Sequence, residues 1–457
     1  MTKRAAKRGA ANRGVTYRGV SGATIRRDEA RYLMNTYKRP AVVFTHGKGS
    51  YLYDDRGGKY LDFLGGIAVN SLGYSHPRIV KVIRREAGRA IHLSNLFHNQ
   101  FQGPLARKLA AWSHLDRVFF TNSGTEAIEG ALKIARAHAR ARAANDSAPK
   151  TRILALTGSF HGRTFGSLAI TYPAKYREPF MPLVPGADFV KFNDIADLEA
   201  QFDSGVCALV METIQGEGGI FPVSEAFWNR ARELANEKGA ALIADEIQCG
   251  LGRTGRAFAY QKFKTLPDIV TIAKPIAAGL PLGAILANEE FASALSPGMH
   301  GTTFGGGPLV CATALEVLKT IEDEKLMKNA RQRGAELVRG LKELAGRFDF
   351  VREVRGEGLM LGLDLSVEGT PFVEAALERG LIMNCTHDHI LRFLPPLNIR
   401  SAHVKEFLSK IESVFVQTPR PKSIGAESAK GAAAKVAGPP KWTPAETRET
   451  AMPLAAR

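Results

Sequence analysis

Residues 241–248 read Ala241-Leu-Ile-Ala-Asp-Glu-Ile-Gln248. Four apolar residues followed directly by two carboxylates are typical of a short strand that is buried on both faces and carries polar groups at its carboxyl end. Burial of an aspartate is costly unless a cation or a hydrogen-bond donor compensates its charge. The stretch therefore predicts a central strand of a parallel sheet, with Asp245 at its end in an ion pair or in a reactive role.

Apolar runs of the same kind lie on either side of this strand, at residues 117–121, 152–157, 206–212, 268–273 and 283–287. Helical or loop segments separate them, as expected for strands joined by crossovers. The pattern predicts an α/β fold with a mostly parallel sheet that is buried on both faces. Because ligands collect at the carboxyl ends of the strands in such sheets, we expect the functional residues there.

A second, smaller α+β domain is predicted from about residue 315, where the pattern changes to a helix, strands within 351–365 and 381–394, and a helix over 402–415. The tail after residue 417 contains many prolines and few large apolar residues, so we expect it to be disordered. The expected parts are a basic disordered extension (1–27), a segment that packs with the small domain (28–75), the large domain (76–314), the small domain (315–417) and the tail (418–457).

The charge of the chain is concentrated at its ends. The 457 residues carry +17, of which the first 27 residues account for +8 and residues 418–457 for +4, leaving +5 for the rest. The composition, 45% hydrophobic and 23% charged, is that of an ordinary globular protein. Binding of nucleic acid through the ends stays an unfavoured alternative. We interpret the Arg-rich start as a cytosolic extension, because it lacks the serines and the amphipathic repeat of a transit peptide.

The mostly apolar residues from Ile269 to Ala287 could be mistaken for a membrane span. Lys274, Pro275 and Pro281 interrupt them, so a buried strand, a loop and a second strand are the better prediction, and no membrane partner is expected. The four cysteines are far apart and form no Cys-x-x-Cys pair, which indicates reduced thiols and a cytoplasmic location.

Lys274 ends the apolar run that follows Asp245 along the chain. Apolar surroundings favour the neutral, nucleophilic amine, although a lysine there can also be the structural partner of an acid. A lysine and an aspartate on successive strand ends are the pair that a pyridoxal phosphate (PLP) enzyme needs, the lysine for a Schiff base and the aspartate to keep the pyridine nitrogen protonated. From these two residues alone, a buried ion pair and a PLP site are equally good interpretations.

A candidate phosphate site follows the run 117–121, where Thr121-Asn-Ser-Gly-Thr-Glu-Ala127 opens a helix. The free N–H groups of a helix N-terminus, a glycine for close approach and the hydroxyls of Ser123 and Thr125 favour a phosphate. Ser123 and Glu126 also form an S-x-x-E capping box, so a purely structural interpretation stays open.

Gly158-Ser-Phe-His-Gly-Arg-Thr164 follows another of the predicted strands. The ring of Phe160 could stack on a flat heterocycle, and Arg163 could clamp a carboxylate with its fork of donors. A surface ion pair is the alternative for Arg163.

Cys385, His387 and His389 alternate in a predicted strand and could all face one way, as metal ligands do. No fourth ligand is visible in the sequence. We therefore expect no metal.

The motifs occur together in one order and spacing: Asn122-Ser-Gly-Thr-Glu-Ala, Ser159-Phe-His-Gly-Arg-Thr, Glu212-Thr-Ile-Gln-Gly-Glu-Gly-Gly, Asp245-Glu-Ile-Gln with Gly252-Arg-Thr-Gly, Lys274, and Gly301-Thr-Thr-Phe-Gly-Gly-Gly-Pro. From about residue 30 to 415 the chain resembles the class III PLP-dependent aminotransferases. The resemblance implies PLP as the cofactor, an aspartate-aminotransferase-like (fold type I) large domain with a smaller α+β domain, and a homodimer with shared active sites.

The resemblance implies that Lys274 and Asp245 are catalytic, Lys274 by holding the cofactor as a Schiff base and then moving a proton, and Asp245 by keeping the ring nitrogen charged. Phe160 would stack on the ring, Gln248 would bind its phenolic oxygen, and Thr303 would reach the phosphate of the partner subunit's cofactor. The residues implied to bind the cofactor are Ser123, Gly124, Thr125, Phe160, His161, Asp245, Gln248, Lys274 and Thr303.

The residues implied to bind substrate are Arg163, Glu212, Glu217 and Arg392. The two arginines would each bind a carboxylate, and Glu217 would neutralise Arg392 unless a dicarboxylate enters. The reaction implied is ping-pong transfer of the terminal amino group of N-acetylornithine, or of a similar diamino or ω-amino acid, to 2-oxoglutarate, which gives glutamate and a semialdehyde.

Ornithine and 4-aminobutyrate remain alternative amino donors, and a PLP aminomutase or racemase is a less favoured reaction, because an isomerase needs no arginine pair. Gly66 and Ile67 stand where the ornithine-specific branch has a gating tyrosine. Thr213 replaces the usual proline, and Gly307 stands where asparagine is common. These two departures bear on loop shape and substrate preference.

Overall fold

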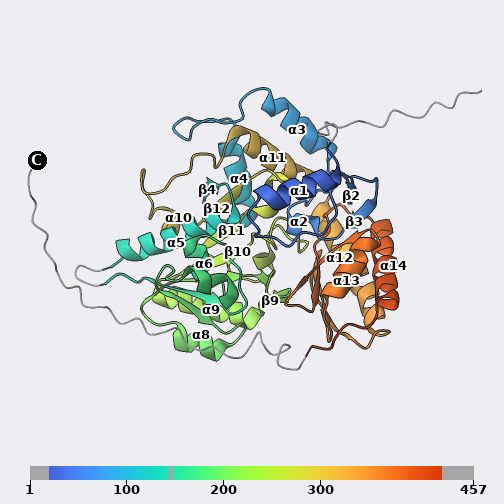
Figure 1. Ribbon diagram of the computed structural model, residues 1–457. Coiled ribbons are helices and arrows are strands. Elements are labelled where there is room, and N and C mark those ends of the chain that lie inside the picture. Colours follow the sequence, from blue (N-terminus) through green and yellow to red (C-terminus); the bar gives the residue numbers. More distant parts are fainter. Residues whose placement is uncertain (1–19, 144–147, 425–457) are drawn as a thin grey trace, which may run out of the picture.

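The computed structural model describes residues 20–143 and 148–424 (Figure 1). Most of the expected extension and tail lies outside these residues. Both expected boundaries nevertheless need correction, because helix α1 (Gly22–Tyr32) begins inside the extension and Ser423 forms a β-bridge with Val367. Ser21 caps α1 with its hydroxyl, a local signal that starts the helix there.

The large domain is built on a seven-stranded sheet. Its order is β4 (Arg117–Thr121), β12 (Gly283–Ala287), β11 (Ile269–Ile272), β10 (Ala241–Asp245), β7 (Val206–Glu212), β5 (Arg152–Leu156) and β6 (Ala187–Val190). Only β12 is antiparallel to its neighbours, so the prediction of a mostly parallel sheet is confirmed. The edge strand β6, a run of four residues, was not among the predicted strands.

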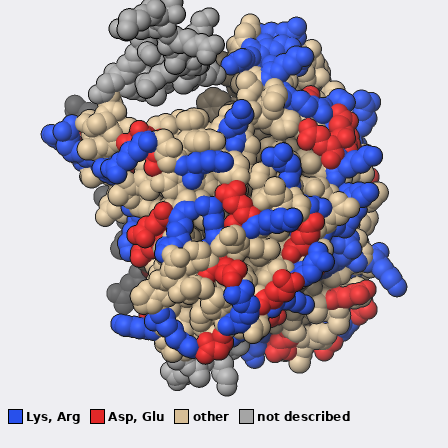
Figure 2. All heavy atoms as spheres, turned by 90° about the vertical axis from the view of Figure 1, so that its right-hand side faces the viewer, with Lys and Arg blue, Asp and Glu red and all other residues tan. Residues whose placement is uncertain are grey.

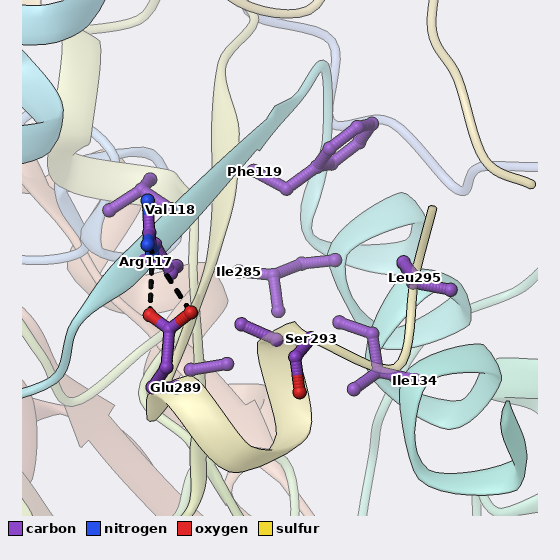
Figure 3. A pocket seen from close by; sticks show the side chains of 10 residues that line it. Arg117, Val118, Phe119, Ile134, Ile285, Glu289, Ser293 and Leu295 are labelled. Carbon is purple, nitrogen blue, oxygen red and sulfur yellow. Dashed lines mark hydrogen bonds and ion pairs between the residues drawn. The ribbon is translucent and has the colours of Figure 1, made fainter. Parts of the chain in front are cut away.

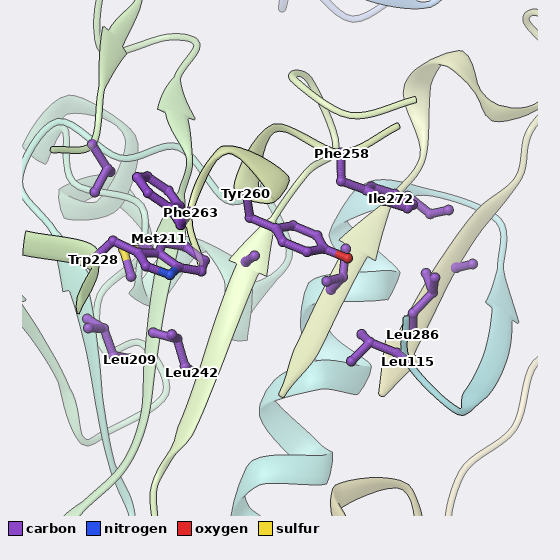
Figure 4. Packing of buried hydrophobic residues seen from close by; sticks show 14 of the residues in the cluster. Leu115, Leu209, Met211, Trp228, Leu242, Phe258, Tyr260, Phe263, Ile272 and Leu286 are labelled. Carbon is purple, nitrogen blue, oxygen red and sulfur yellow. The ribbon is translucent and has the colours of Figure 1, made fainter. Parts of the chain in front are cut away.

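Helices cover both faces of this sheet. On one face α5 (Gly124–Ala141) packs on β11 and β12, and on the other α9 (Glu225–Lys238) packs on β7 and β10. The side chains of a strand alternate between the two faces: Ile243 belongs to the α5 side, and Leu242 to the α9 side. Figure 4 shows the α9 side, where Trp228 lies over Leu209, Met211 and Leu242.

The small domain contains a four-stranded antiparallel sheet in the order β13 (Val351–Glu357), β14 (Met360–Leu365), β17 (Ile390–Phe393) and β16 (Asn384–Thr386). Helices α12 (Leu326–Ala345), α13 (Thr370–Glu378) and α14 (Ser401–Gln417) pack around it, at the right of Figure 1.

The segment before the large domain pairs with the small domain. Strands β1 (Phe44–Lys48), β2 (Tyr51–Asp54) and β3 (Lys59–Asp62) form a sheet with β15 (Leu381–Ile382). The Tyr51 hydroxyl donates to Glu406 of α14 at 2.6 Å. Both contacts join residues of the range 28–75 to residues of the range 315–417.

The idea that Cys385, His387 and His389 share one strand face is wrong. His387 and Asp388 have φ values of 48° and 61°, so they form the turn between β16 and β17 and the alternation is lost. The described residues contain no group of three or more metal-ligating side chains that could hold an ion.

The remaining elements connect these layers: α2 (Gly65–Ala68), α3 (Pro77–Ala87), α4 (Gln102–Ser113), α6 (Phe165–Ala169), α7 (Ala174–Arg177), α8 (Ile195–Gln201), α10 (Glu289–Ala292), α11 (Pro308–Asp323), the two-residue strands β8 (Ile214–Gln215) and β9 (Phe221–Pro222), and 3₁₀ turns at Glu178–Phe180, Ala259–Lys262 and Lys274–Ala277. Residues 269–287 form β11, a 3₁₀ turn and β12, as predicted.

Within the described ranges, the helices are all too short or too polar to cross a membrane. On the side that Figure 2 shows, Lys and Arg are interspersed with Asp and Glu.

Candidate active site

The carboxyl ends of β5, β7, β10 and β11 meet at one cavity of about 230 Å³. The residues that line it are Thr125, Phe160, His161, Gly162, Arg163, Glu212, Asp245, Ile247, Gln248 and Lys274. Because these residues come from loops far apart in the chain, it is the sheet that brings them together.

Asp245 and His161 form a buried pair in this cavity. His161 Nδ1 lies 2.8 Å from Asp245 Oδ2, and the two residues are 2% and 3% exposed. The other carboxylate oxygen of Asp245 accepts from the Ile247 N–H at 3.0 Å. His161 Nε2 is buried and has no hydrogen-bond partner among the described residues. The pair fixes the direction in which the Asp245 carboxylate points.

Lys274 begins the 3₁₀ turn after β11 and is partly exposed at the cavity wall. Burial lowers the pKa of its amine, although the carboxylates of Asp245 and Glu217 act in the opposite direction. A depressed pKa keeps more of the amine neutral, which is the form that reacts with a carbonyl.

Glu212 joins two loops of the site from the end of β7. Its oxygens accept main-chain hydrogen bonds from Phe160 at 2.9 Å and from Gly216 at 2.7 Å. Burial raises the pKa of its carboxyl, an effect that the nearby His161 opposes. Since both oxygens already serve the main chain, the geometry favours a positioning role for Glu212 over the expected contact with substrate.

The N-terminus of α5 forms the edge of the cavity through Thr125. Ser123 is the N-cap, and its hydroxyl accepts from the Glu126 N–H at 3.3 Å, so the structural interpretation of the Ser123 hydroxyl holds. A Cβ at Gly124 would lie 2.8 Å from Cδ1 of Ile247, which explains why a glycine stands there. Thr125 Oγ1 lies 2.7 Å from Ser167 Oγ. The helix end itself remains suited to an anion.

Arg163 lies at the mouth of the cavity. Its guanidinium carbon is 3.8 Å from the ring centroid of Tyr176 and 5.4 Å from that of Phe160. It is exposed and forms no ion pair with any described residue, so the surface ion pair considered for it is not present. The sequence carried no signal for Tyr176, because only the fold brings α7 next to this loop.

Arg392 of β17 reaches the site from the small domain. It is fully buried, and its Nη1 lies 2.5 Å from Glu217 Oε1 and 3.3 Å from Gln248 Oε1. Nε donates to Asn384 at 3.2 Å, whereas Nη2 has no partner within the described part of the chain. Burial pushes the pKa of Glu217 up, but the charge of Arg392 outweighs this effect and holds it below its ordinary value. Asn384 was not predicted from the sequence.

Thr303 does not line this cavity. It lies in a separate surface cavity of about 400 Å³ with Asn122, Glu126 and Thr302 among its walls. In a single chain it is therefore outside the cavity at Lys274, although Asn122 and Glu126 of the same surface cavity flank Ser123, Gly124 and Thr125 in the chain.

A further cavity, of about 360 Å³, lies beside the edge strand β4 (Figure 3). Val118, Phe119, Ile134, Ile285 and Leu295 make it mostly apolar, and its charged groups, Arg117 and Glu289, bind each other at 2.6 Å. Its hydroxyl, Ser293, donates to the Glu290 carbonyl at 2.9 Å, and neither lysine nor histidine is among its lining residues, so its chemistry does not compete with that of the cavity at Lys274.

The cavity at Lys274 fits PLP. A lysine with a lowered pKa, a buried aspartate oriented by histidine, an aromatic ring and a helix N-terminus match the aldehyde, the ring nitrogen, the ring face and the phosphate. A buried arginine with an unpaired nitrogen adds a receptor for a substrate carboxylate. Fold and site together define a PLP-dependent enzyme of fold type I.

Comparison with known proteins narrows this class. The family model of aminotransferase class III matches residues 32–415. The chain is 43% identical over 391 residues to the acetylornithine aminotransferase of Methanocaldococcus jannaschii, covering 85% of this chain and 97% of the relative. It is 44% identical over 386 residues to that of Aquifex aeolicus, covering 84% and 100%.

Solved structures agree. The ornithine aminotransferase of Toxoplasma gondii superposes with a TM-score of 0.83 at 34% identity, covering 88% of this chain and 96% of that one. The acetylornithine aminotransferase of Elizabethkingia anophelis gives 0.77 at 30%, covering 87% and 99%. The chain belongs to the class III aminotransferases and is a PLP-dependent transaminase.

Proposed function

We propose that this enzyme transfers the terminal amino group of N-acetylornithine to 2-oxoglutarate. The observation that carries the proposal is the buried Arg392–Glu217 ion pair, which lies beside Gln248 at the Lys274 cavity. Such a pair offers a neutral surface to a donor whose reacting carbon carries no carboxylate. The names of relatives more than 40% identical over most of the chain support the donor.

The geometry of the site supports a role for each of its residues. Bound PLP supplies an electron sink for the bond that breaks at the substrate carbon. Asp245, oriented by His161, holds the proton on the pyridine nitrogen. The Lys274 amine, whose pKa burial lowers, would hold the cofactor and would serve as the base that moves the proton of the carbon that carries the transferred amine. Phe160 stacks on the ring, and the N-terminus of α5 binds the phosphate.

Two substrates use one pocket through the loop of residues 214–222, which we call the gate loop. With N-acetylornithine, Glu217 stays on Arg392, and Arg163 at the cavity mouth binds the α-carboxylate. With glutamate or 2-oxoglutarate, Glu217 swings aside, Arg392 binds the α-carboxylate beside the reacting carbon, and Arg163 at the cavity mouth binds the side-chain carboxylate. The unpaired Nη2 of Arg392 supports this second state.

Ornithine is a second candidate donor, because ornithine aminotransferases are among the similar structures. Gly66 and Ile67 argue against it. This segment packs beside the gate loop, since Ile67 and Ala68 share an apolar cluster with Ile214 and Ile220, and it offers no tyrosine hydroxyl there to bind a second charged amine.

We further infer a homodimer. Thr303 lies on the surface near two exposed apolar side chains, Phe304 at 66% and Leu96 at 88% exposure. A partner that covers them would place Thr303 at the other subunit's cofactor phosphate.

Two separate groups of apolar cores support a large and a small domain as predicted (76–314 and 315–417), but Ile79 packs in the small-domain core, Leu318 packs in the large-domain core, and α11 crosses the predicted boundary. The four free cysteines support a reducing compartment such as the cytoplasm.

Single-turnover reactions of the PLP-loaded enzyme with N-acetylornithine, ornithine and 4-aminobutyrate, followed by the absorbance of the cofactor, test the donor. N-acetylornithine should react fastest, and a faster reaction with ornithine would overturn the assignment. In Glu217→Ala the donor half-reaction should slow about tenfold more than the 2-oxoglutarate half-reaction. A protein that binds no PLP would contradict the whole proposal.

A further inference from the structure

A row of residues crosses the small-domain sheet directly below the gate loop. In the strand register Arg355 of β13 is opposite Gly362 of β14, Gly362 is opposite Arg392 of β17, and Arg392 is opposite Asn384 of β16. Residues that are directly opposite in neighbouring strands point to the same face. Two buried arginines therefore flank a glycine on one face of the sheet.

The gate loop contacts each of these three positions in turn. Arg392 binds Glu217, and Arg355 Nε donates to the Gly219 carbonyl at 2.8 Å. Between them, Gly362 leaves room for Ile220: a Cβ at Gly362 would lie 3.1 Å from the Cβ of Ile220. Arg392, which we expect to bind substrate, and Arg355 thus hold the same loop, at positions two residues apart.

Arg355 is itself held rigidly. Its Nη1 donates at 2.8 Å to both Glu353 and Asp364, and its guanidinium carbon lies 3.9 Å from the ring centroid of Phe221 in β9. The side chain is only 6% exposed. A buried guanidinium that is fixed by two carboxylates and an aromatic ring makes a firm anchor for the Gly219 carbonyl.

The backbone of the gate loop needs such an anchor. Gly219 has φ 114° and Ile220 has φ 60°. A β-branched residue at positive φ is rare and costs free energy, so it persists only where surrounding contacts hold it. Without Arg355, we expect the loop to relax and to carry Glu217 away from Arg392.

We propose that Arg355 is a positioning residue for substrate selection, which fastens the gate loop to the small domain so that Glu217 neutralises Arg392 while the amino donor is bound. The inference rests on the proposed two-substrate function of the Glu217–Arg392 pair. It assigns Arg355 no contact with substrate or cofactor. Replacement of Arg355 should raise the KM for the amino donor relative to the KM for the dicarboxylate.

The kinetic test compares the half-reactions of PLP-loaded Arg355→Met and Arg355→Lys. For Arg355→Met the KM for N-acetylornithine should rise about tenfold, as expected for the loss of one charge-assisted hydrogen bond, while the KM for 2-oxoglutarate changes less than about twofold. Arg355→Lys, which keeps the charge but loses the fork, should fall in between. Equal changes in both KM values, or none, would overturn the proposal.

Arg352→Met is the matched control. Arg352 lies on the same strand and also faces Asp364, at 3.8 Å, but has no hydrogen bond to residues 214–222 in the described structure. It should leave both KM values unchanged. Gly362→Ala approaches the loop from another position of the row, and its added methyl should push Ile220 away and raise the donor KM in the same direction.

Hydrogen–deuterium exchange of residues 214–222 gives a readout that does not depend on any substrate. Exchange there should be about tenfold faster in Arg355→Met than in the wild type or in Arg352→Met. If the wild type fails to use N-acetylornithine, the proposed donor is wrong, yet the exchange still decides whether Arg355 holds the loop. Unchanged exchange in a folded Arg355→Met enzyme would refute the anchor.

Discussion

His161 Nδ1 lies 2.8 Å from Asp245 Oδ2, and both side chains are buried beside Lys274. Their loops follow different strands, β5 and β10, with β7 between them in the sheet. The contact means that the carboxylate that we assign to the pyridine nitrogen is held by a second residue.

His161→Ala should therefore weaken PLP binding by tenfold or more, since a charge-assisted hydrogen bond contributes about 1.5–3 kcal/mol. Quenching of protein fluorescence by added PLP measures the dissociation constant. His389→Ala is the control, because His389 is also buried and lies 3.8 Å from a carboxylate, Asp364, outside the cavity. An equal loss of affinity in the two variants would contradict an orienting role for His161.

The depressed pKa of Lys274 makes a prediction about pH. Between its folded pKa and the ordinary value near 10.5, the unfolded chain binds a proton at Lys274 that the folded, cofactor-free protein does not. Stability should therefore rise with pH across this window. Lys274→Met lacks this contribution. The unfolding free energy of the variant minus that of the wild type, measured with urea from pH 7 to 10, should therefore decrease as pH rises. A constant difference would show that the pKa is not depressed.

Gly124→Ala should impair the phosphate end of the site, because the new methyl would meet Cδ1 of Ile247 at 2.8 Å. We expect PLP affinity to fall severalfold, and Ile247→Ala in the same chain to restore part of it. Gly103→Ala is the control: it is also in the first turn of a helix, but its added Cβ meets nothing within 4 Å. Titration with PLP distinguishes the three variants.

Trp228 supports the α9 side of the sheet. It is fully buried, stacks on Phe263 at 4.6 Å between centroids, and donates to Thr265 at 3.0 Å. Trp228→Ala should lower the free energy of unfolding by about 3–5 kcal/mol. Trp112→Ala, at a partly exposed tryptophan, should cost clearly less in the same urea titration.

The shared-site hypothesis can be tested by mixing subunits. If Thr303 acts on the partner subunit's cofactor, the Lys274→Ala variant and the Thr303→Arg variant should each be weakly active or inactive alone. Hybrids would contain one site with an intact Lys274 and an intact Thr303, so mixing after mild dissociation should restore activity. No recovery in verified hybrids would place Thr303 outside the partner's site.

Much of the large domain could be predicted from local patterns. The strands β4, β7 and β12 begin and end where the apolar runs do. The short strand β6 was missed, because four residues give too little periodicity to recognise. The turn at His387 and Asp388 was not predicted, because both residues adopt positive φ values that the sequence alone does not indicate.

The sequence by itself determined which groups stand at strand ends, among them Asp245 and Lys274, because apolar runs and the polar residues that close them are local properties. Only the tertiary structure decided their partners. Three contacts join residues that are separated along the chain and that only the packing of the sheet and its loops brings together. They are His161 with Asp245, Tyr176 with Arg163, and Arg355 with Gly219. Local patterns specify elements, whereas contacts between distant residues depend on how the elements pack, and that is where the selectivity of the site arises.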